Sequence, residues 1–228
     1  QFQTLYSMIN KANLTIDGVK SAGTSGVVST ATSTQYEAEC SFLRAFAHHE
    51  LVVKFSRPYL DGNGSQMGII YRDCAINSDA TSTAARAIVR STVKVSDTYT
   101  KILADLDFAE ANLAATNAGT GLSTYRATKA AAIALKMRVK LHMGDWAGVI
   151  AEGAKIVSGT APNFSSPIGG WKLTATPDGP FANNTSTESV FSIKNDATDN
   201  SGVNGALAQM MGDPALGARG LLRVSPVI

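Results

Sequence analysis

Hydrophobic residues recur at intervals of three and four along much of the chain, which is the period of a helix with one buried face. The clearest case is residues 127–143, where apolar side chains fall at offsets 0, 3, 4, 7 and 11 counted from the first of them. These positions are Ala130, Ile133, Ala134, Met137 and Leu141. The pattern predicts an amphipathic helix whose apolar stripe faces the core.

Two further ridges run along the same predicted helix. One carries small or slender side chains and would let another helix approach closely; it consists of Ala127, Ala131 and Leu135. The other carries only lysines, which we expect to face solvent; it consists of Lys129, Lys136 and Lys140.

Gly144 and Asp145 predict a tight turn after this helix. Glycine tolerates the left-handed conformation that ends a helix, and aspartate can cap the next one. The second helix is expected at 145–158, with Trp146 in the core of the pair. The Gly-Asp-Trp turn resembles that of a tetratricopeptide unit, in which two antiparallel helices form a hairpin.

Similar periodicity predicts helices at 94–115 and 35–55, and a further helix near the N-terminus within "TLYSMINKANLTID". We expect the helices to stack as pairs, one pair spanning about 35–115 and the other 123–158. The sequence thus predicts one mostly α domain over 1–228, built as a tetratricopeptide-like helix-pair scaffold.

Two regions depart from the helical pattern. Residues 56–92 form a long stretch rich in Gly, Asn, Asp and Ser, and long loops of this kind are often functional. Residues 159–228 contain short alternating runs such as "SVFSI" between turn clusters. We expect loops and a few short β-strands there.

The totals exclude several classes of protein. The chain has 228 residues, of which 44% are hydrophobic and 17% charged, which is a globular rather than a disordered composition. A net charge of +2, with no dense Lys/Arg block, gives no electrostatic case for nucleic acid or an anionic membrane surface. No apolar run approaches the roughly 20 residues of a membrane helix. The opening "QFQTLYSMIN" lacks the features of a signal peptide, so we expect a piece of a longer protein.

Candidate chemistry is sparse. His48 and His49 are adjacent and would point about 100° apart on a helix, unlike the histidines of an HExxH zinc site. No GxSxG or phosphate-binding glycine loop occurs, and Asp105 and Asp107 are expected to lie exposed on a helix. We therefore expect no catalytic residues, no metal and no cofactor. Whether Cys40 and Cys74 form a disulfide stays open.

Four stretches, in order, resemble the SusD/RagB family of outer-membrane nutrient-binding lipoproteins over about residues 35–210. They are "AECSFLRAFAHHELVVKFSRPYL", "RSTVKVSDTYTKILADLDFAEANL", "YRATKAAAIALKMRVKLHMGDWAGVIAEGAKIVSG" and "STESVFSIKNDATDNSGVNGAL". The resemblance implies stacked tetratricopeptide-like helix pairs overlaid by loops. Members are typically much longer, so the chain would be the N-terminal part of the mature protein.

The same resemblance implies a role. It predicts a non-enzymatic protein on the cell surface of Bacteroidota-type bacteria, held in the outer membrane by an N-terminal lipid anchor that this chain lacks. Its partner would be a TonB-dependent (SusC-like) transporter, and its ligand an oligosaccharide. Two alternatives stay open: a peptide-capturing member of the family, and a soluble tetratricopeptide-type interaction scaffold.

The long loop offers the side chains that a glycan site needs, which are aromatic faces for C–H surfaces and planar polar groups for hydroxyls. We expect ligand contacts from Tyr59, Asp61, Asn63, Tyr71, Arg72 and Asp73. No residue-level motif of the family supports these six. Alternatively, the two tyrosines pack the loop onto the scaffold and the arginine pairs with a neighbouring acid.

Overall fold

The computed structural model describes residues 1–119, 121–159, 164–182, 185–194, 196, 198 and 210–222. The chain divides into two compact units, Gln1–Phe191 and Ser192–Ile228. In the described residues the helices of the first unit are α1 (Phe2–Thr24), α2 (Thr30–Phe55), α3 (Asp79–Ala87), η1 (Arg90–Thr92), α4 (Val95–Asn112), α5 (Leu122–Tyr125), α6 (Lys129–Met143), α7 (Trp146–Ile156) and α8 (Gly179–Ala182). The mostly α fold expected from the sequence is confirmed.

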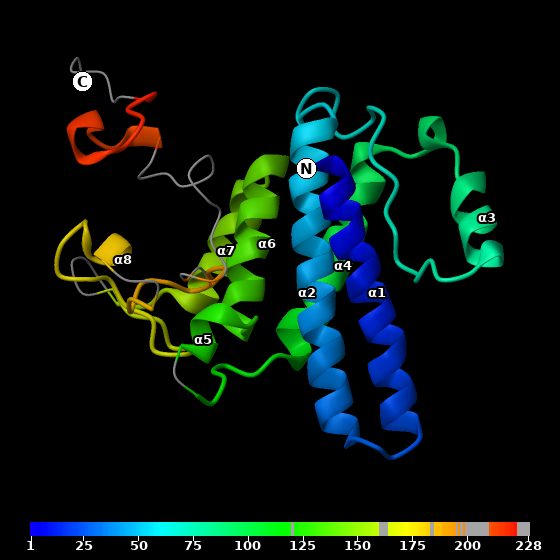
Figure 1. Cartoon of the computed structure of the whole chain (residues 1–228), viewed down its shortest axis with the longest axis horizontal. Coiled ribbons are helices and arrows are strands. Elements are labelled where there is room, and N and C mark those ends of the chain that lie inside the picture. The colour runs from blue at the N-terminus through cyan, green and yellow to red at the C-terminus, as the bar shows by residue number, and fades with distance from the viewer. Residues whose placement is uncertain are drawn as a thin grey trace. The chain divides into compact units, whose positions relative to one another are not determined.

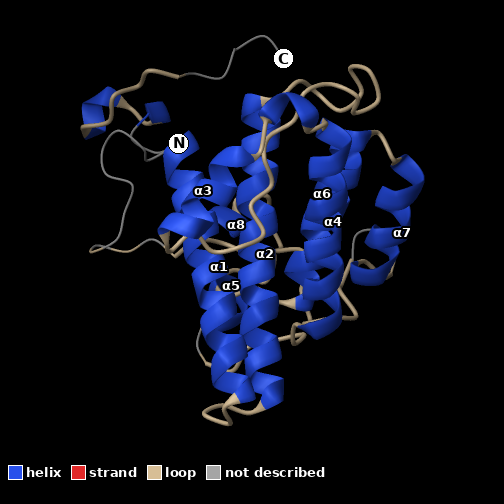
Figure 2. Ribbon diagram, turned by 90° about the vertical axis from the view of Figure 1, so that its right-hand side faces the viewer, coloured by secondary structure: helices blue, strands red, loops and turns tan. Residues whose placement is uncertain are grey.

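Five helices of the first unit pack in series, in the order α1, α2, α4, α6, α7, each against the next (Figures 1 and 2). The turn between α1 and α2 uses Gly26 at φ 74°, and Ser29 caps α2 by accepting from the Thr32 N–H at 3.1 Å. This serial packing brings the start of α1, the end of α2 and the end of α6 to the same end of the unit (Figure 2).

The α6–α7 hairpin has the turn that the sequence predicts. Gly144 adopts a left-handed conformation at φ 73°, and the Asp145 carboxylate accepts from the Gly148 N–H at 2.9 Å. On the opposite face of α6, Ala131 is buried in the core shared with α2 and α4. The small ridge therefore serves close helix packing, but against α2 and α4 rather than within the hairpin. Leu141 of the expected apolar stripe is 45% exposed instead of facing the core.

Trp146 corrects an expectation, because it is 64% exposed rather than buried between α6 and α7. The inward face of α7 carries Val149, Glu152, Gly153 and Ile156, and Glu152 is drawn in by lysines of α6. That orientation turns Trp146 and Ile150 toward solvent, the latter 72% exposed.

Lys136 corrects a second expectation. It is buried, and its ammonium pairs with Asp107 at 2.6 Å, Glu110 at 2.7 Å and Glu152 at 3.1 Å. Carboxylates from two neighbouring helices replace the water that the lysine would otherwise bind, which is the condition for burying a charge. Asp105 is likewise enclosed rather than exposed, because it pairs with Arg44.

The short strands expected after residue 159 are not formed in the residues that the structure describes. Ser165 makes isolated bridges to Ser158 and Lys172 only. Residues 189–193, expected as a strand, form no ladder; instead Phe191 inserts its ring edge-on against Phe42, with centroids 4.9 Å apart. The aromatic side chain thus fixes this segment on α2. Parts of the expected strand region, 160–163, 183–184 and 199–209 among them, lie outside the described residues.

The second unit is described in a short part only. Its η2 (Pro214–Leu216) is capped by Asp213, whose carboxylate accepts from the Ala215 N–H at 2.9 Å, and ends at Gly217 with φ 85°. The N–H groups of Leu221 and Leu222 both donate to the carbonyl of Met210.

Candidate functional site

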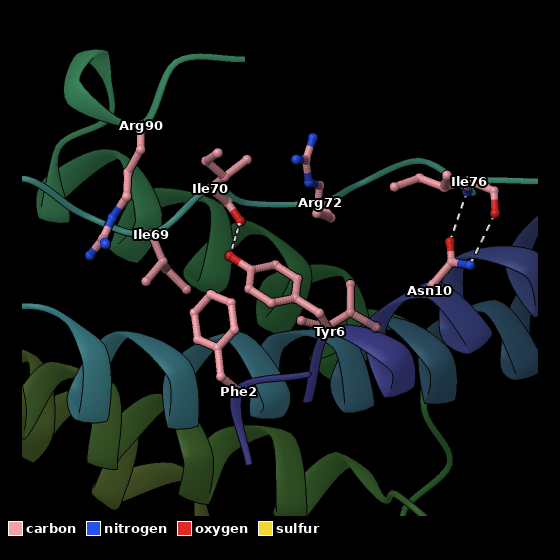
Figure 3. Close-up of a pocket in the computed structure, with 9 residues that line it drawn as sticks. Phe2, Tyr6, Asn10, Ile69, Ile70, Arg72, Ile76 and Arg90 are labelled. Carbon is pink, nitrogen blue, oxygen red and sulfur yellow. Dashed lines mark hydrogen bonds between the residues drawn. The ribbon is translucent and has the colours of Figure 1, made fainter. Parts of the chain in front are cut away.

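Residues 68–76 lie across α1, α2 and α4 as an extended segment, which we call the crossing segment. Helix side chains bond its backbone where a partner strand otherwise would. The Tyr6 hydroxyl donates to the Ile70 carbonyl at 2.8 Å. The Asn10 amide donates to the Ile76 carbonyl at 3.1 Å and accepts from its N–H at 2.8 Å (Figure 3). These backbone groups of Ile70 and Ile76 are therefore satisfied without a sheet.

Further anchors act on the same backbone. The Asn13 amide, buried in α1, donates to the carbonyls of Arg72 at 3.1 Å and Cys74 at 2.9 Å. The Thr98 hydroxyl on α4 donates to the Ile69 carbonyl at 3.1 Å. Side chains of two helices, α1 and α4, thus hold the segment through its main chain.

Beneath the crossing segment lies a set of bonded side chains, the Arg44 cluster, which consists of Asn13, Arg44, His48, Tyr71 and Asp105. Arg44 donates two bonds to Asp105, from Nε at 2.7 Å and Nη2 at 2.6 Å, and a third from Nη1 to the Asn13 amide oxygen at 2.8 Å. The Tyr71 hydroxyl donates to the same carboxylate. Burial, reinforced by the Asp105 charge, raises the pKa of Tyr71, so the phenol stays a donor.

His48 links the cluster to the crossing segment. Its ring stacks on Tyr71 with centroids 3.7 Å apart, and its Nε2 accepts from the Arg72 N–H at 3.0 Å. A ring nitrogen that accepts from an amide carries no proton, so the imidazole is neutral and its Nδ1–H donates to the Arg44 carbonyl at 2.9 Å. Burial is the main cause that lowers the pKa of His48 to about 3.

A pocket of about 360 Å³ opens between α1 and the crossing segment. Apolar and aromatic side chains form most of its wall, and Arg72 and Arg90 complete it. The wall residues are Phe2, Tyr6, Ile9, Asn10, Ile69, Ile70, Arg72, Ile76 and Arg90. In Figure 3 the two arginines lie on either side of Ile70, and Phe2 and Tyr6 lie side by side on the α1 side. The volume is that of a small-molecule site.

The structure distributes the six predicted ligand residues over two places. Tyr71, Arg72 and Asp73 lie in the crossing segment. Of these, Tyr71 is buried with its hydroxyl bonded, Asp73 is exposed and paired with Lys101 at 2.9 Å, and Arg72 lines the pocket. Of these three, only Arg72 has an accessible side chain without a hydrogen bond or ion pair to any described residue.

Tyr59, Asp61 and Asn63 lie instead in the turn that follows α2. Tyr59 packs edge-on against Tyr99, Asp61 pairs with Arg57, and Asn63 adopts φ 54° as a turn residue. The six residues therefore do not converge on one point, and their role in ligand binding stays a prediction. Sequence reasoning missed the α1 side of the pocket, since Phe2, Tyr6 and Asn10 look like ordinary positions of an amphipathic helix.

The turn after α2 lies beside the α6–α7 turn. Leu60 packs so closely on Gly144 that a Cβ there would come within 2.9 Å of the leucine side chain. Trp146 follows two residues later with its ring in solvent, and Leu60 is 61% exposed. An aromatic face and polar turn residues thus occur at one end of the unit.

Within the described residues, no group of three or more His, Cys, Asp or Glu side chains could hold a metal ion. Cys40 and Cys74 are free thiols, the first half-buried and the second exposed. No described helix has the length and hydrophobicity to cross a membrane.

The fold defines the class of protein: it is a mostly helical scaffold of stacked, tetratricopeptide-like helix pairs. The family described as "Starch-binding associating with outer membrane" (SusD-like) matches residues 1–141. The chain belongs to this SusD-like family, as the resemblance in its sequence predicts.

Solved structures are similar to the chain over most of its length. A SusD superfamily protein from Bacteroides fragilis has 26% identity and a TM-score of 0.65, covering 86% of this chain and 40% of its own. A SusD superfamily protein from Bacteroides thetaiotaomicron has 20% identity and a TM-score of 0.65. The match covers 89% of this chain and 40% of the Bacteroides thetaiotaomicron chain.

A SusD-like carbohydrate binding protein from Bacteroides vulgatus has 18% identity and a TM-score of 0.53, covering 66% of this chain and 29% of its own. Comparison with curated proteins gave no significant match. The chain spans two fifths or less of each of these structures, and those under 25% identity are similar in fold alone.

Proposed function

We propose that this chain is part of a non-enzymatic cell-surface protein that captures oligosaccharides for uptake. The observation that carries the proposal is the match of residues 1–141 to a starch-binding, outer-membrane-associated family. A lipid anchor would hold the protein in the outer membrane, and a TonB-dependent transporter would receive the glycan.

The surface that best suits glycan contact in this chain is the turn after α2 together with Trp146. A sugar ring presents C–H groups that stack on an aromatic face, and its hydroxyls need planar polar partners. Trp146 offers the face, and Asp61 and Asn63 offer the polar groups, with Arg57 already holding the aspartate. Affinity would be modest, because each hydroxyl exchanges a bond to water for one to protein.

Binding can be tested by presenting the purified protein to a glycan array and to a peptide pool, followed by calorimetry on the hits. We expect saturable binding to one class of oligosaccharide and none to the peptides. Trp146→Ala should weaken glycan binding by roughly two- to tenfold, which is the range expected for one aromatic contact. Phe181→Ala, which removes an even more exposed ring from α8, is the control and should change nothing.

Other results would redirect the assignment. Binding confined to peptides would favour a peptide-capturing member of the family. Binding to neither, with a protein partner recovered instead, would favour an interaction scaffold. Release of reducing ends from a polysaccharide would contradict the non-enzymatic part of the proposal.

A further inference from the structure

The pocket between α1 and the crossing segment has a chemistry that differs from the glycan surface. Several of its polar groups are committed to the protein. The Asn10 side-chain amide donates one bond to the Ile76 backbone and accepts one from it, and the Tyr6 hydroxyl donates its proton to the Ile70 carbonyl. A sugar ring placed here would find few partners for its hydroxyls, which is costly. The walls instead suit an apolar body.

The charge of the pocket is uncompensated. Arg90 donates to two carbonyls, those of Gly68 and Phe55, both at 2.9 Å, and these partners are neutral. The Arg72 side chain has no hydrogen bond or ion pair among the described residues, and no carboxylate lines the wall. Both arginines line the pocket, and the positive charge of each opposes the rise that burial causes in the pKa of Tyr6. A guanidinium in this state is suited to a carboxylate, which it can bind through two parallel bonds.

We propose that this pocket binds a small monocarboxylic acid, its apolar body between Phe2, Tyr6 and the isoleucines and its carboxylate on Arg72. The size agrees, because a cavity of about 150 Å³ already holds benzene, and this one measures about 360 Å³. The acid can be aliphatic or aromatic, since the wall offers both kinds of contact. This site is separate from the proposed glycan surface and does not depend on it.

The test is a titration of the whole chain, labelled at isoleucine methyl groups, with matched acids and amides. The probes are octanoate, 4-phenylbutyrate, the amides of both, and glucuronate. We expect at least one of the two acids to bind with a Kd of about 0.1–1 mM, and its amide to bind at least about tenfold more weakly. The methyl signals of the wall isoleucines should shift, while that of Ile150 on α7 should not. Comparison of octanoate with phenylbutyrate distinguishes an aliphatic from an aromatic ligand.

Two variants complete the test. Arg72→Gln should weaken binding of the acid at least about fivefold, so that its affinity comes close to that of its amide. Arg86→Gln, on the exposed face of α3, has the same change of charge and should leave binding unaltered. Retained dispersion of the isoleucine methyl signals shows that each variant is folded.

Several results would overturn the proposal. An amide that binds as tightly as its acid would reduce the site to a plain apolar cavity. Equal binding of glucuronate would remove the need for an apolar body, and shifts centred on Ile150 would place the ligand elsewhere. No saturable shift by either acid up to ~10 mM would also refute it. None of these outcomes touches the glycan array result, so the two proposals fail separately.

Discussion

Two clusters of paired charged residues hold this protein together in different ways. The Arg44 cluster joins α1, α2 and α4 to the crossing segment through directional bonds, several of them to main-chain atoms. The second group, the Lys136 cluster, joins α4, α6 and α7 almost entirely through charges; it consists of Asp107, Glu110, Lys136, Lys140, Glu152 and Lys155. The first fixes a loop, and the second fixes the spacing of helices.

The two clusters differ in how many alternative partners each charged group has. In the Lys136 cluster, Glu152 has three lysine partners, so the loss of one leaves two. In the Arg44 cluster, Arg44 and Tyr71 both donate to the same carboxylate, that of Asp105. No other described carboxylate pairs with the Arg44 guanidinium. The Arg44 cluster should therefore be the more fragile of the two.

Breaking the Arg44 cluster should have the largest effect. Asp105→Ala leaves the enclosed Arg44 guanidinium unpaired and the Tyr71 hydroxyl without an acceptor, and should lower the free energy of unfolding by about 3–5 kcal/mol. Urea unfolding followed by circular dichroism measures it. The control is Asp107→Ala, two residues further along α4 and 64% exposed, which should cost about 0–1 kcal/mol. Similar losses for both variants would contradict the comparison.

Breaking the Lys136 cluster should cost less. Lys136→Met keeps much of the side-chain volume but removes the central cation, and Lys140 and Lys155 partly replace it. We expect a loss of about 2–3 kcal/mol, below the full cost of an orphaned buried charge. Lys155→Gln, at the exposed edge of the cluster, should cost under about 1 kcal/mol. A larger loss from Lys136→Met than from Asp105→Ala would reverse the ranking of the two clusters.

Packing on the small face of α6 gives a third test. Ala131→Leu adds three carbon atoms where α6 meets the core and should cost about 1–3 kcal/mol by overpacking. The same change at the exposed Ala147 of α7 is the control and should be nearly neutral. An unchanged melting temperature for Ala131→Leu would count against close contact at this ridge.

Acidification should weaken the Arg44 cluster before the Lys136 cluster. The unfolded chain protonates its histidines near pH 6.5, whereas His48 in the folded protein does so only at about pH 3. Its contribution is therefore complete above pH 6.5 and falls with decreasing pH, by about 1 kcal/mol between pH 7 and 5.5. His49, whose pKa burial lowers to about 4, adds a similar loss.

The Lys136 cluster should respond at lower pH. Burial alone would raise the pKa of Glu152, but hydrogen bonds from Lys155, Lys140 and Lys136 lower it to about 2 from 4.5. Its contribution is present above pH 4.5 and is lost only as the pH falls toward 2. Urea unfolding at pH 7 and 5.5 measures the first loss, and unfolding at pH 4 measures the beginning of the second. A flat profile from pH 7 to 5.5 would contradict the assignment to His48 and His49.

The sequence predicted what local periodicity determines. Apolar spacing located α1, α2, α4, α6 and α7, and Gly144 with Asp145 located the turn of the hairpin. The sequence did not locate α3 (Asp79–Ala87), which lies within residues 56–92 that were expected as a loop. It failed for Lys136, Asp105 and Trp146, because residue type alone predicts exposure for the first two and burial for the third. Their environments depend on partners distant in sequence: Arg44 is 61 positions from Asp105.

The candidate site was predicted only in part for the same reason. Loop composition drew attention to residues 56–92, and Arg72 within them lines the pocket. The opposite wall comes from the first turns of α1, whose Phe2, Tyr6 and Asn10 carry no motif. Only the fold brings residues 6 and 70, or 10 and 76, into contact.

The helices hold the crossing segment chiefly by its carbonyl and amide groups, which every amino acid except proline possesses in full. Substitutions at positions such as 70, 72 and 73 can therefore change the outer surface of the segment while Tyr6, Asn10 and Asn13 keep it docked. A segment attached in this way can vary in sequence at little risk to folding. Its hydrogen-bonding groups are also partly occupied from within, which discourages strand-to-strand association between neighbouring molecules.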